Sequence, residues 1–256
     1  MIAAVFGDVH GNLPAMYDLC QTWQDEHKEQ LDLVLQTGDF SLWTSPDQMD
    51  KAAKKFYKQD QTELSAAPYL SSQKIAPITT WFIHGNHENF PLLAERQGLA
   101  VDPHGRITYL ATGSVTEFCK GTEKLRVAAL GGIEYRFGKF PIPSDKPVQK
   151  YLHPPSLQHL CEQKQNVDVL LLHDAPLNKG LRSRFPTGSK RITELIEILQ
   201  PRFTFYGHYD DPPDPFYIGS TFCAPTNLAS AKRIPNRDGA MGILRTDIWQ
   251  FSYVEP

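Results

Sequence analysis

The sequence lacks the cysteine patterns that would stabilise a small secreted fold. Its four cysteines form no CxxC pair and no tight cluster; they are Cys20, Cys119, Cys161 and Cys223. Four widely spaced cysteines in a chain of 256 residues indicate reduced thiols rather than a disulfide framework.

Long hydrophobic runs are absent as well. No apolar stretch approaches the ~20 residues that cross a membrane. The apolar start, Met1–Phe6, is far too short for a signal peptide and runs directly into a charged motif. Together with reduced cysteines, these absences predict a cytoplasmic protein without a membrane partner.

The chain also has little net charge, formally −3 at pH 7. Proteins that hold long nucleic acids by the backbone usually carry a basic surface, so this balance argues against that role. A nucleotide or a short nucleic acid held mainly by metal ions is still compatible with it. Hydrophobic residues at 41% and charged residues at 21% predict an ordinary packed core. Because no repeat, low-complexity tract or linker divides the chain, we expect one domain over residues 1–256.

Apolar runs that end at glycine or polar residues predict strands alternating with helices. The first strand is Ile2–Phe6, and apolar residues at helical spacing predict a helix over Leu13–Trp23. Further strands are predicted at Leu31–Gln36, Ile78–Ile83, Ile107–Leu110, Leu125–Leu130, Val167–Leu172 and Arg202–Tyr206, and further helices at Ser45–Asp60, Leu92–Gln97, Ser156–Gln163 and Lys190–Leu199. From Phe216 onward short β segments follow. This order predicts an α/β fold of two stacked mixed β-sheets flanked by helices.

Polar residues follow five of the predicted strands, at the point where each strand ends. The five segments are Gly7–Asn12, Thr37–Asp39, Gly85–Glu88, His173–Asp174 and Gly207–Asp210. Ligands of α/β sheets bind at the carboxyl ends of strands, so these segments are candidates for one site. Carboxylate oxygens and imidazole nitrogens together suit Mn²⁺, Fe or Zn²⁺. Two such ions ~3.5–4 Å apart bind both sides of a phosphoester and generate a hydroxide nucleophile near neutral pH.

Each segment alone is a weak signal. Asp8 and His10 are also compatible with a turn aspartate and a surface histidine, and Gly38-Asp39 is a common turn dipeptide. A single histidine such as His173 is more often a hydrogen-bonded core residue than a ligand. The ordered set DxH, GD, GNHE, H and GH, each after a strand, is what predicts a metal site.

This ordered set resembles the motifs of the calcineurin-like metallophosphoesterase superfamily, over roughly residues 1–230. The resemblance implies an αββα sandwich with two divalent metal ions at the strand ends. The implied metal ligands are Asp8 and His10 for the first ion, Asp39 as the bridge, and Asn86, His173 and His208 for the second ion. It also implies that His87 binds no metal and instead stabilises charge on the phosphate or protonates the leaving oxygen. Glu88 would orient neighbouring groups.

One position departs from the family pattern. The family usually ends its motifs with GHxH, whereas this chain has Gly207-His208-Tyr209-Asp210. We expect Asp210 to bind the first metal, directly or through water, which favours Mn²⁺ or Mg²⁺ over Zn²⁺. The alternative is that this shorter side chain falls short and leaves the first metal exchangeable. Manganese is therefore the metal we expect, with iron, zinc or magnesium as alternatives.

Two further segments resemble the RNA lariat debranching enzymes, Ala76–Glu88 and Leu130–Tyr135. Protein phosphatases carry a longer arginine-containing motif after the second strand, which is missing after Asp39. Debranching enzymes often have cysteine where this chain has Asp8, and they usually retain the final histidine. The likeness therefore implies a phosphodiesterase-type pocket rather than one substrate. Tyr135 and Arg136 are candidates to reach the phosphate or stack on a base.

The sequence thus predicts a dinuclear-metal-dependent phosphoester hydrolase. The favoured form is a phosphodiesterase that uses a metal-bound hydroxide on a nucleotide-type or other small phosphoester. A phosphomonoesterase or protein phosphatase is the alternative within this chemistry. A non-catalytic protein-binding module with the same fold is the alternative of another class, and Asp210 is the feature that favours it. The oligomeric state and the physiological substrate are left open.

Overall fold

The computed structural model describes residues 1–58, 61–135, 148–163, 166–177, 187–209, 214–226 and 239–255. These residues form two six-stranded sheets. The first has the strand order β12 (Gln250–Tyr253), β11 (Met241–Arg245), β1 (Ile2–Phe6), β2 (Leu33–Gln36), β3 (Thr80–Phe82) and β4 (Ile107–Tyr109). The second has the order β5 (Val115–Lys120), β6 (Glu123–Leu130), β7 (Val169–Leu172), β8 (Phe203–Tyr206), β10 (Thr221–Pro225) and β9 (Phe216–Ile218).

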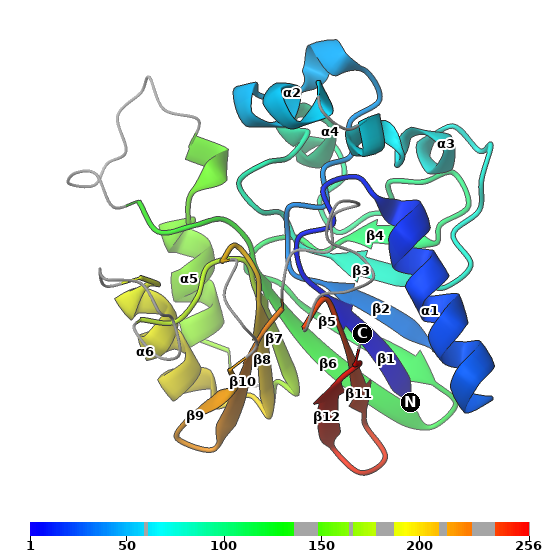
Figure 1. Ribbon diagram of the computed structural model, residues 1–256. Coiled ribbons are helices and arrows are strands. Elements are labelled where there is room, and N and C mark those ends of the chain that lie inside the picture. The colour runs from blue at the N-terminus through cyan, green and yellow to red at the C-terminus, as the bar shows by residue number, and fades with distance from the viewer. Residues whose placement is uncertain are drawn as a thin grey trace.

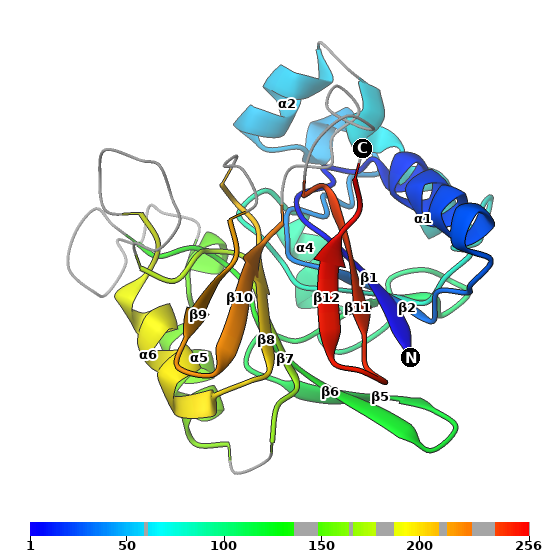
Figure 2. The same cartoon turned by 60° about the horizontal axis from the view of Figure 1, so that its bottom comes forward.

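Both sheets are mixed, with a parallel centre. Strands β1, β2, β3 and β4 run parallel to one another, and so do β6, β7, β8 and β10. The β11–β12 hairpin, β5 and β9 pair antiparallel at the edges. Figure 2 shows β11 and β12 beside β1, and β9 beside β10. Because parallel strands present their carboxyl ends at one edge, each sheet collects several loops there.

Helices cover the outer face of each sheet. Helix α1 (Leu13–His27) lies on the first sheet, and α5 (Pro154–Cys161) and α6 (Lys190–Leu199) lie on the second (Figure 1). The side chain of Asn12 caps α1 by accepting a hydrogen bond from the Ala15 N–H, and Ser189 caps α6 in the same way from Ile192. With two stacked mixed sheets between helices, the predicted fold class is confirmed.

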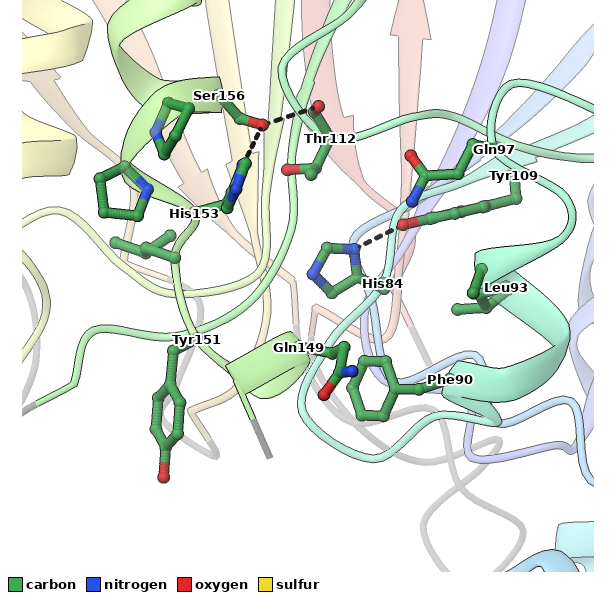
Figure 3. A pocket seen from close by; sticks show the side chains of 14 residues that line it. His84, Phe90, Leu93, Gln97, Tyr109, Thr112, Gln149, Tyr151, His153 and Ser156 are labelled. Atoms are coloured by element: carbon green, nitrogen blue, oxygen red, sulfur yellow. Dashed lines mark hydrogen bonds between the residues drawn. The ribbon is translucent and has the colours of Figure 1, made fainter. Parts of the chain in front are cut away.

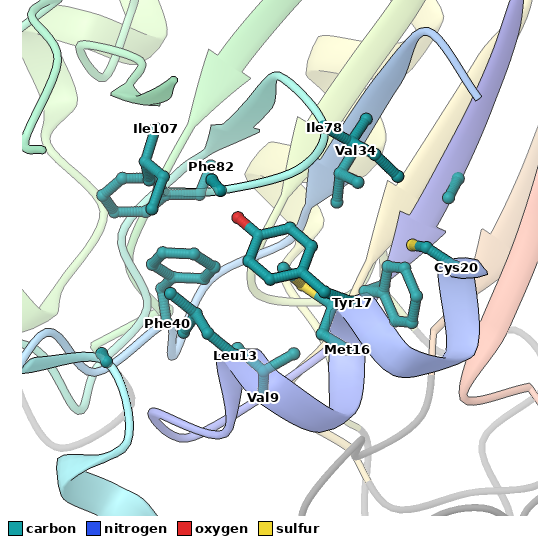
Figure 4. Close-up of a cluster of buried hydrophobic side chains, with 14 of the residues drawn as sticks. Val9, Leu13, Met16, Tyr17, Cys20, Val34, Phe40, Ile78, Phe82 and Ile107 are labelled. Carbon is teal, nitrogen blue, oxygen red and sulfur yellow. The ribbon is translucent and has the colours of Figure 1, made fainter. Parts of the chain in front are cut away.

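The strand residues divide by alternation between two apolar layers. In β1, Ala3 and Val5 pack between the sheets, whereas Ala4 and Phe6 face the layer under α1. This is the period of two expected when both faces of a strand are buried. Figure 4 shows the layer under α1, where Tyr17 lies among apolar side chains of the sheet. A third apolar cluster fills the space between the second sheet and its helices.

A group of short helices lies over the strand ends of the first sheet (Figure 1). It contains η1 (Pro46–Gln48), α2 (Lys51–Tyr57), η2 (Gln61–Leu64), α3 (Ala67–Leu70) and α4 (Phe90–Ala94). The single helix predicted over Ser45–Asp60 is wrong, because the backbone of Met49 is extended (φ −63°, ψ 143°). A new helix starts at Lys51 and is capped by Asp50, whose Oδ1 accepts hydrogen bonds from Ala52 N and Ala53 N, each at 2.9 Å.

Other differences are smaller. Helix α4 begins at Phe90 rather than Leu92, because the Asn89 side chain caps it there. Strand β5 and helix α3 were not predicted, and both carry exposed or half-buried residues that weaken a periodic pattern. The four cysteines are free, as predicted. Among the described residues, no helix has the length and apolar character to cross a bilayer.

Candidate metal centre and active site

The candidate site lies where strands of both sheets end. Asp8 and His10 follow β1, and Asp39 follows β2. Each of these three side chains offers a ligand atom, and the three atoms lie within 4.8 Å of one another. The backbone is left-handed at His10 (φ 46°), Asp39 (φ 51°) and His208 (φ 69°). Such backbone is costly for residues other than glycine, and it clusters at functional sites because the surrounding fold holds it in place.

Asp39 lies between two groups of side chains. Its Oδ2 is 3.9 Å from His10 Nε2, and its Oδ1 is 3.5 Å from His173 Nε2. His173 follows β7 of the second sheet, so one carboxylate faces imidazoles from both sheets. This is the position expected of a carboxylate that bridges two ions.

His173 is held in a defined tautomer. Its Nδ1 is 2.9 Å from the Thr37 carbonyl oxygen, which accepts hydrogen bonds only, so Nδ1 carries a proton. Burial lowers the pKa of His173, which favours the neutral ring with a bare Nε2. That Nε2 lies 3.0 Å from Asn86 Oδ1. Both atoms offer an electron pair, so their close approach is consistent with one cation that binds both of them.

The second sheet also contributes His208, which follows β8. Its ring centroid is 5.1 Å from that of His173, and its backbone N–H lies 3.2 Å from both carboxylate oxygens of Asp8. Burial lowers the pKa of His208 to about 4, so the ring is neutral and able to bind a metal near pH 7.

The buried carboxylates of the site are suited to binding a cation. Burial, and next the neighbouring Asp39, raise the pKa of Asp8 well above its ordinary value. Burial also opposes ionisation of Asp39, but the imidazoles of His173 and His10 hold the pKa of Asp39 below its usual range. Two buried carboxylates grouped with imidazoles and an amide oxygen form a donor set suited to divalent ions of the Mn, Fe or Zn type. The residues present therefore fit the two metal ions that the sequence predicts.

Two glycines make this close approach possible. A β-carbon at Gly85 would collide with the carboxylate of Asp39, and one at Gly207 would collide with the carboxylate of Asp8. Both positions therefore require the absence of a side chain.

Glu88 joins the loops that follow β2 and β3. Its carboxylate accepts backbone hydrogen bonds from Phe40 (2.8 Å), Ser41 (2.8 Å) and Gly85 (3.1 Å). Burial raises the pKa of Glu88 to about 8, with a further contribution from Asp39. Glu88 thus contacts the backbone of the site and holds it in shape.

His87 lies beside the predicted metal ligands, and both its backbone N–H and its ring form hydrogen bonds. Its N–H donates to Asp39 Oδ1 at 2.7 Å, and its ring Nδ1 donates to Asp50 Oδ2 at 2.7 Å. The Lys150 ammonium donates to the same oxygen of Asp50 at 3.0 Å. Burial favours the neutral ring, but the hydrogen bond to Asp50 raises the pKa of His87 above its ordinary value. The pair can therefore hold a proton on the imidazole close to the predicted metal ions.

Sequence reasoning missed Asp50 and Lys150. Asp50 has two roles, since Oδ1 caps helix α2 while Oδ2 pairs with His87. The local signal for it was a helix cap before Lys51, hidden by the stronger Ser45-Pro46 signal upstream. Lys150 stands in η3 (Val148–Lys150) and carries no motif of its own.

Three predicted site residues remain without a described role. Asp210 and Arg136 lie outside the described residues. Tyr135 is buried, and its ring packs edge-on against Tyr151 at 4.9 Å between centroids. Its predicted contact with substrate stays a prediction.

Residues 1–210 match the family model described as calcineurin-like phosphoesterase. The chain belongs to that family, as its motifs predict.

Its curated relatives are named as lariat debranching enzymes. The enzyme of Arabidopsis thaliana is 28% identical over 243 residues, which cover 81% of this chain and 54% of the relative. Lariat debranching enzyme A of Xenopus laevis is 32% identical and the Homo sapiens enzyme 30%, each over 81% of this chain and 42% of the relative. The chain thus spans about half the length of the curated relatives it matches.

Solved structures share the fold at low sequence identity. The protein TT1561 of Thermus thermophilus superposes with a TM-score of 0.58 at 16% identity, over 99% of this chain and 98% of that one. GAP50 of Plasmodium, described as the anchor in the inner membrane complex, gives a TM-score of 0.51 at 12% identity over 95% and 80%. At these identities the likeness concerns the fold alone.

Proposed function

We propose that the protein is a dinuclear-metal phosphodiesterase that cleaves a nucleotide-type or other small phosphodiester. The observation that carries this proposal is the position of Asp39. One carboxylate faces His10 with one oxygen and His173 with the other, while its Oδ1 also accepts the His87 N–H. Two metal positions and one candidate acid–base group therefore share a single central residue.

The metal ions, when bound, would polarise the phosphoester and lower the pKa of water to provide the nucleophile. We assign Asp8 and His10 to one ion, Asn86, His173 and His208 to the other, and Asp39 to both. His87 would contact the phosphate or donate its proton to the leaving oxygen, because Asp50 favours its charged form.

A diester is favoured over a monoester by the relatives. They are named lariat debranching enzymes, and the resemblance of Ala76–Glu88 and Leu130–Tyr135 to the RNA lariat debranching enzymes implies a phosphodiesterase-type pocket. Short RNA or a dinucleotide is therefore the first substrate class to test. We also propose manganese as the native metal, because of the carboxylate and imidazole donors. The absence of a linker in the sequence supports a single domain over 1–256. The widely spaced cysteines and the lack of long apolar runs support a cytoplasmic location.

Metal-stripped protein refilled with Mn²⁺ is expected to hydrolyse bis-p-nitrophenyl phosphate faster than p-nitrophenyl phosphate. The two assays run side by side, with metal-free protein as the blank, because both reactions release p-nitrophenolate and report on the same chromophore. Preference for the monoester would contradict the diesterase assignment and favour a phosphatase. No turnover of either ester despite two bound ions would favour the non-catalytic alternative.

Replacing Asp50 with asparagine is expected to lower kcat on the diester by about 10–100-fold, a part of the ~10²–10⁴-fold that a positioned acid or base contributes, because asparagine lacks the charge that favours protonated His87. KM and metal content should stay close to those of the unmodified protein, because Asp50 acts through His87 rather than on a metal ion. Asp50→Glu should recover part of kcat. A loss of helix α2 instead would appear in circular dichroism and as a change in KM, and would contradict a positioning role.

Asp210 offers a test that comes from sequence alone. Asp210→Ala is expected to lower the occupancy of the first metal position, measured as metal per chain after dialysis. Unchanged stoichiometry would contradict coordination by this carboxylate.

A further inference from the structure

A cavity of about 590 Å³ is lined by His84 and Phe90, which flank the loop that carries Asn86 and His87. One wall comes from helix α4 and the end of β4, with Phe90, Leu93 and Tyr109, and the other from the segment 149–156. Figure 3 shows His84 between these walls, with its Nδ1 hydrogen-bonded to the Tyr109 hydroxyl at 2.8 Å. The volume lies within the range of small-ligand pockets.

Residues that line the cavity are neighbours in sequence of residues in the candidate site. His84 lines the cavity and precedes Gly85-Asn86-His87, which contains a predicted metal ligand. On the other wall, Gln149 and Tyr151 line the cavity and flank Lys150, whose ammonium contacts the Asp50 partner of His87. The cavity is therefore lined by two segments that also carry site residues, one with Asn86 and His87 and the other with Lys150.

The lining has a definite chemical character. It combines aromatic, aliphatic and proline side chains with the amides of Gln97 and Gln149. None of the described residues that line it is Asp, Glu, Lys or Arg. Of the described lining residues only the histidines can carry charge, so the lining favours an uncharged occupant over a phosphate or carboxylate group.

Several polar lining groups are already paired. The Ser156 hydroxyl donates to the Thr112 carbonyl oxygen at 3.1 Å and contacts His153 Nδ1 at 2.8 Å. The amides of Gln97 and Gln149 make no hydrogen bond to another described residue and are exposed. An amide both donates and accepts, which matches the mixed edge of a nucleobase, while aromatic rings match its faces.

We propose that this cavity binds a nucleobase attached to the phosphodiester, with the base against Phe90 and Tyr109 and the amides of Gln97 and Gln149 as partners for its polar edges. The inference rests on the proposed phosphodiesterase function and names its substrate class. It adds a base-binding site to the metal centre, so the enzyme would distinguish a nucleoside diester from an alkyl diester.

Adenosine binding and diester hydrolysis are measured in separate experiments. Adenosine and ribose are titrated against the metal-loaded full chain by saturation-transfer difference NMR, which detects weak binding without turnover. Adenosine but not ribose is expected to receive saturation, strongest at the adenine protons. Ala94→Leu places a larger side chain at an exposed position of the cavity lining and should weaken adenosine binding about tenfold, the equivalent of losing one stacked base.

Two further variants serve as a control for Ala94→Leu and as a second test of the cavity. Glu95→Leu adds the same side chain one residue further along the chain, at an exposed position outside the lining, and should bind adenosine as the unmodified chain does. Gln149→Ala should weaken adenosine binding through loss of its amide. Equal binding of adenosine by Ala94→Leu and the unmodified chain, or no binding by the latter, would overturn the proposal.

Hydrolysis of methyl p-nitrophenyl phosphate, which has no base, tests the proposed function independently. Glu95→Leu should cleave it with unchanged kcat/KM, because this residue belongs neither to the metal centre nor to the cavity lining. If the unmodified chain binds adenosine through the cavity but cleaves no diester, the phosphodiesterase proposal fails and the base site stands. If it cleaves the methyl diester but binds no adenosine, the base site fails alone.

Discussion

Asp39→Asn is expected to reduce diester hydrolysis by at least about 10³-fold, since metal assistance contributes several kcal/mol to such reactions. Asparagine keeps the shape of the side chain and an oxygen that accepts the His87 N–H, now 2.7 Å from Asp39 Oδ1. It loses the charge and the second ligand oxygen. Both metal positions share this residue in the proposed assignment, so both should weaken together.

The measurement is metal content by plasma mass spectrometry after dialysis, beside kcat/KM on bis-p-nitrophenyl phosphate. The unmodified chain should hold two ions and the variant one or fewer. Asp25→Asn, an exposed site on α1 whose carboxylate contacts Gln21, is the control for loss of one carboxylate. Two tightly bound ions and normal activity in Asp39→Asn would contradict the bridging role.

His87→Ala is expected to lower kcat by about 10²–10⁴-fold, the usual contribution of a general acid. Metal content should not change, because His87 turns its ring to Asp50 rather than to the ligand group. The two roles left open for His87 differ in their dependence on the leaving group. A general acid matters more for a poor alkoxide leaving group than for p-nitrophenolate, whereas charge stabilisation at the phosphate affects both alike.

The experiment therefore compares bis-p-nitrophenyl phosphate with a dinucleotide whose leaving group is a sugar hydroxyl. A larger loss on the dinucleotide would assign proton donation to His87, and equal losses would assign charge stabilisation. His104→Ala changes an exposed histidine in no motif and should leave both rates intact. Full activity of His87→Ala on both substrates would contradict any direct role.

The strand ends could be predicted because their signals are local. From Ile2 to His10, an apolar run, a glycine and a DxH motif stand within nine residues. A glycine likewise stands between β2 and Asp39 and between β3 and Asn86. An apolar run predicts where a strand ends, and parallel pairing places that end beside its neighbours. Family membership and fold class followed from this order and are confirmed, whereas the ligand roles are predictions that the metal measurements will decide.

The partners of His87 could not be predicted in the same way. Asp50 lies 37 residues before His87 in the sequence, and Lys150 lies 100 residues after Asp50. No period or motif connects these positions, since they meet only after the short helices have folded over the strand ends. The break at Met49 that frees Asp50 to cap α2 was equally invisible, because Ser45-Pro46 predicted one continuous helix.

The sequence by itself determined which chemical groups stand at the strand ends, because apolar runs and the residues that stop them are neighbours along the chain. Only the tertiary structure decided that Asp39 faces imidazoles from both sheets, that Asp50 contacts His87, and that Gln97 and Gln149 line one cavity. These relations join segments far apart in sequence, and their distances depend on how two sheets pack and how loops cover their ends. Local patterns carry no information on such packing, which is why the cavity beside His84 came from the fold alone.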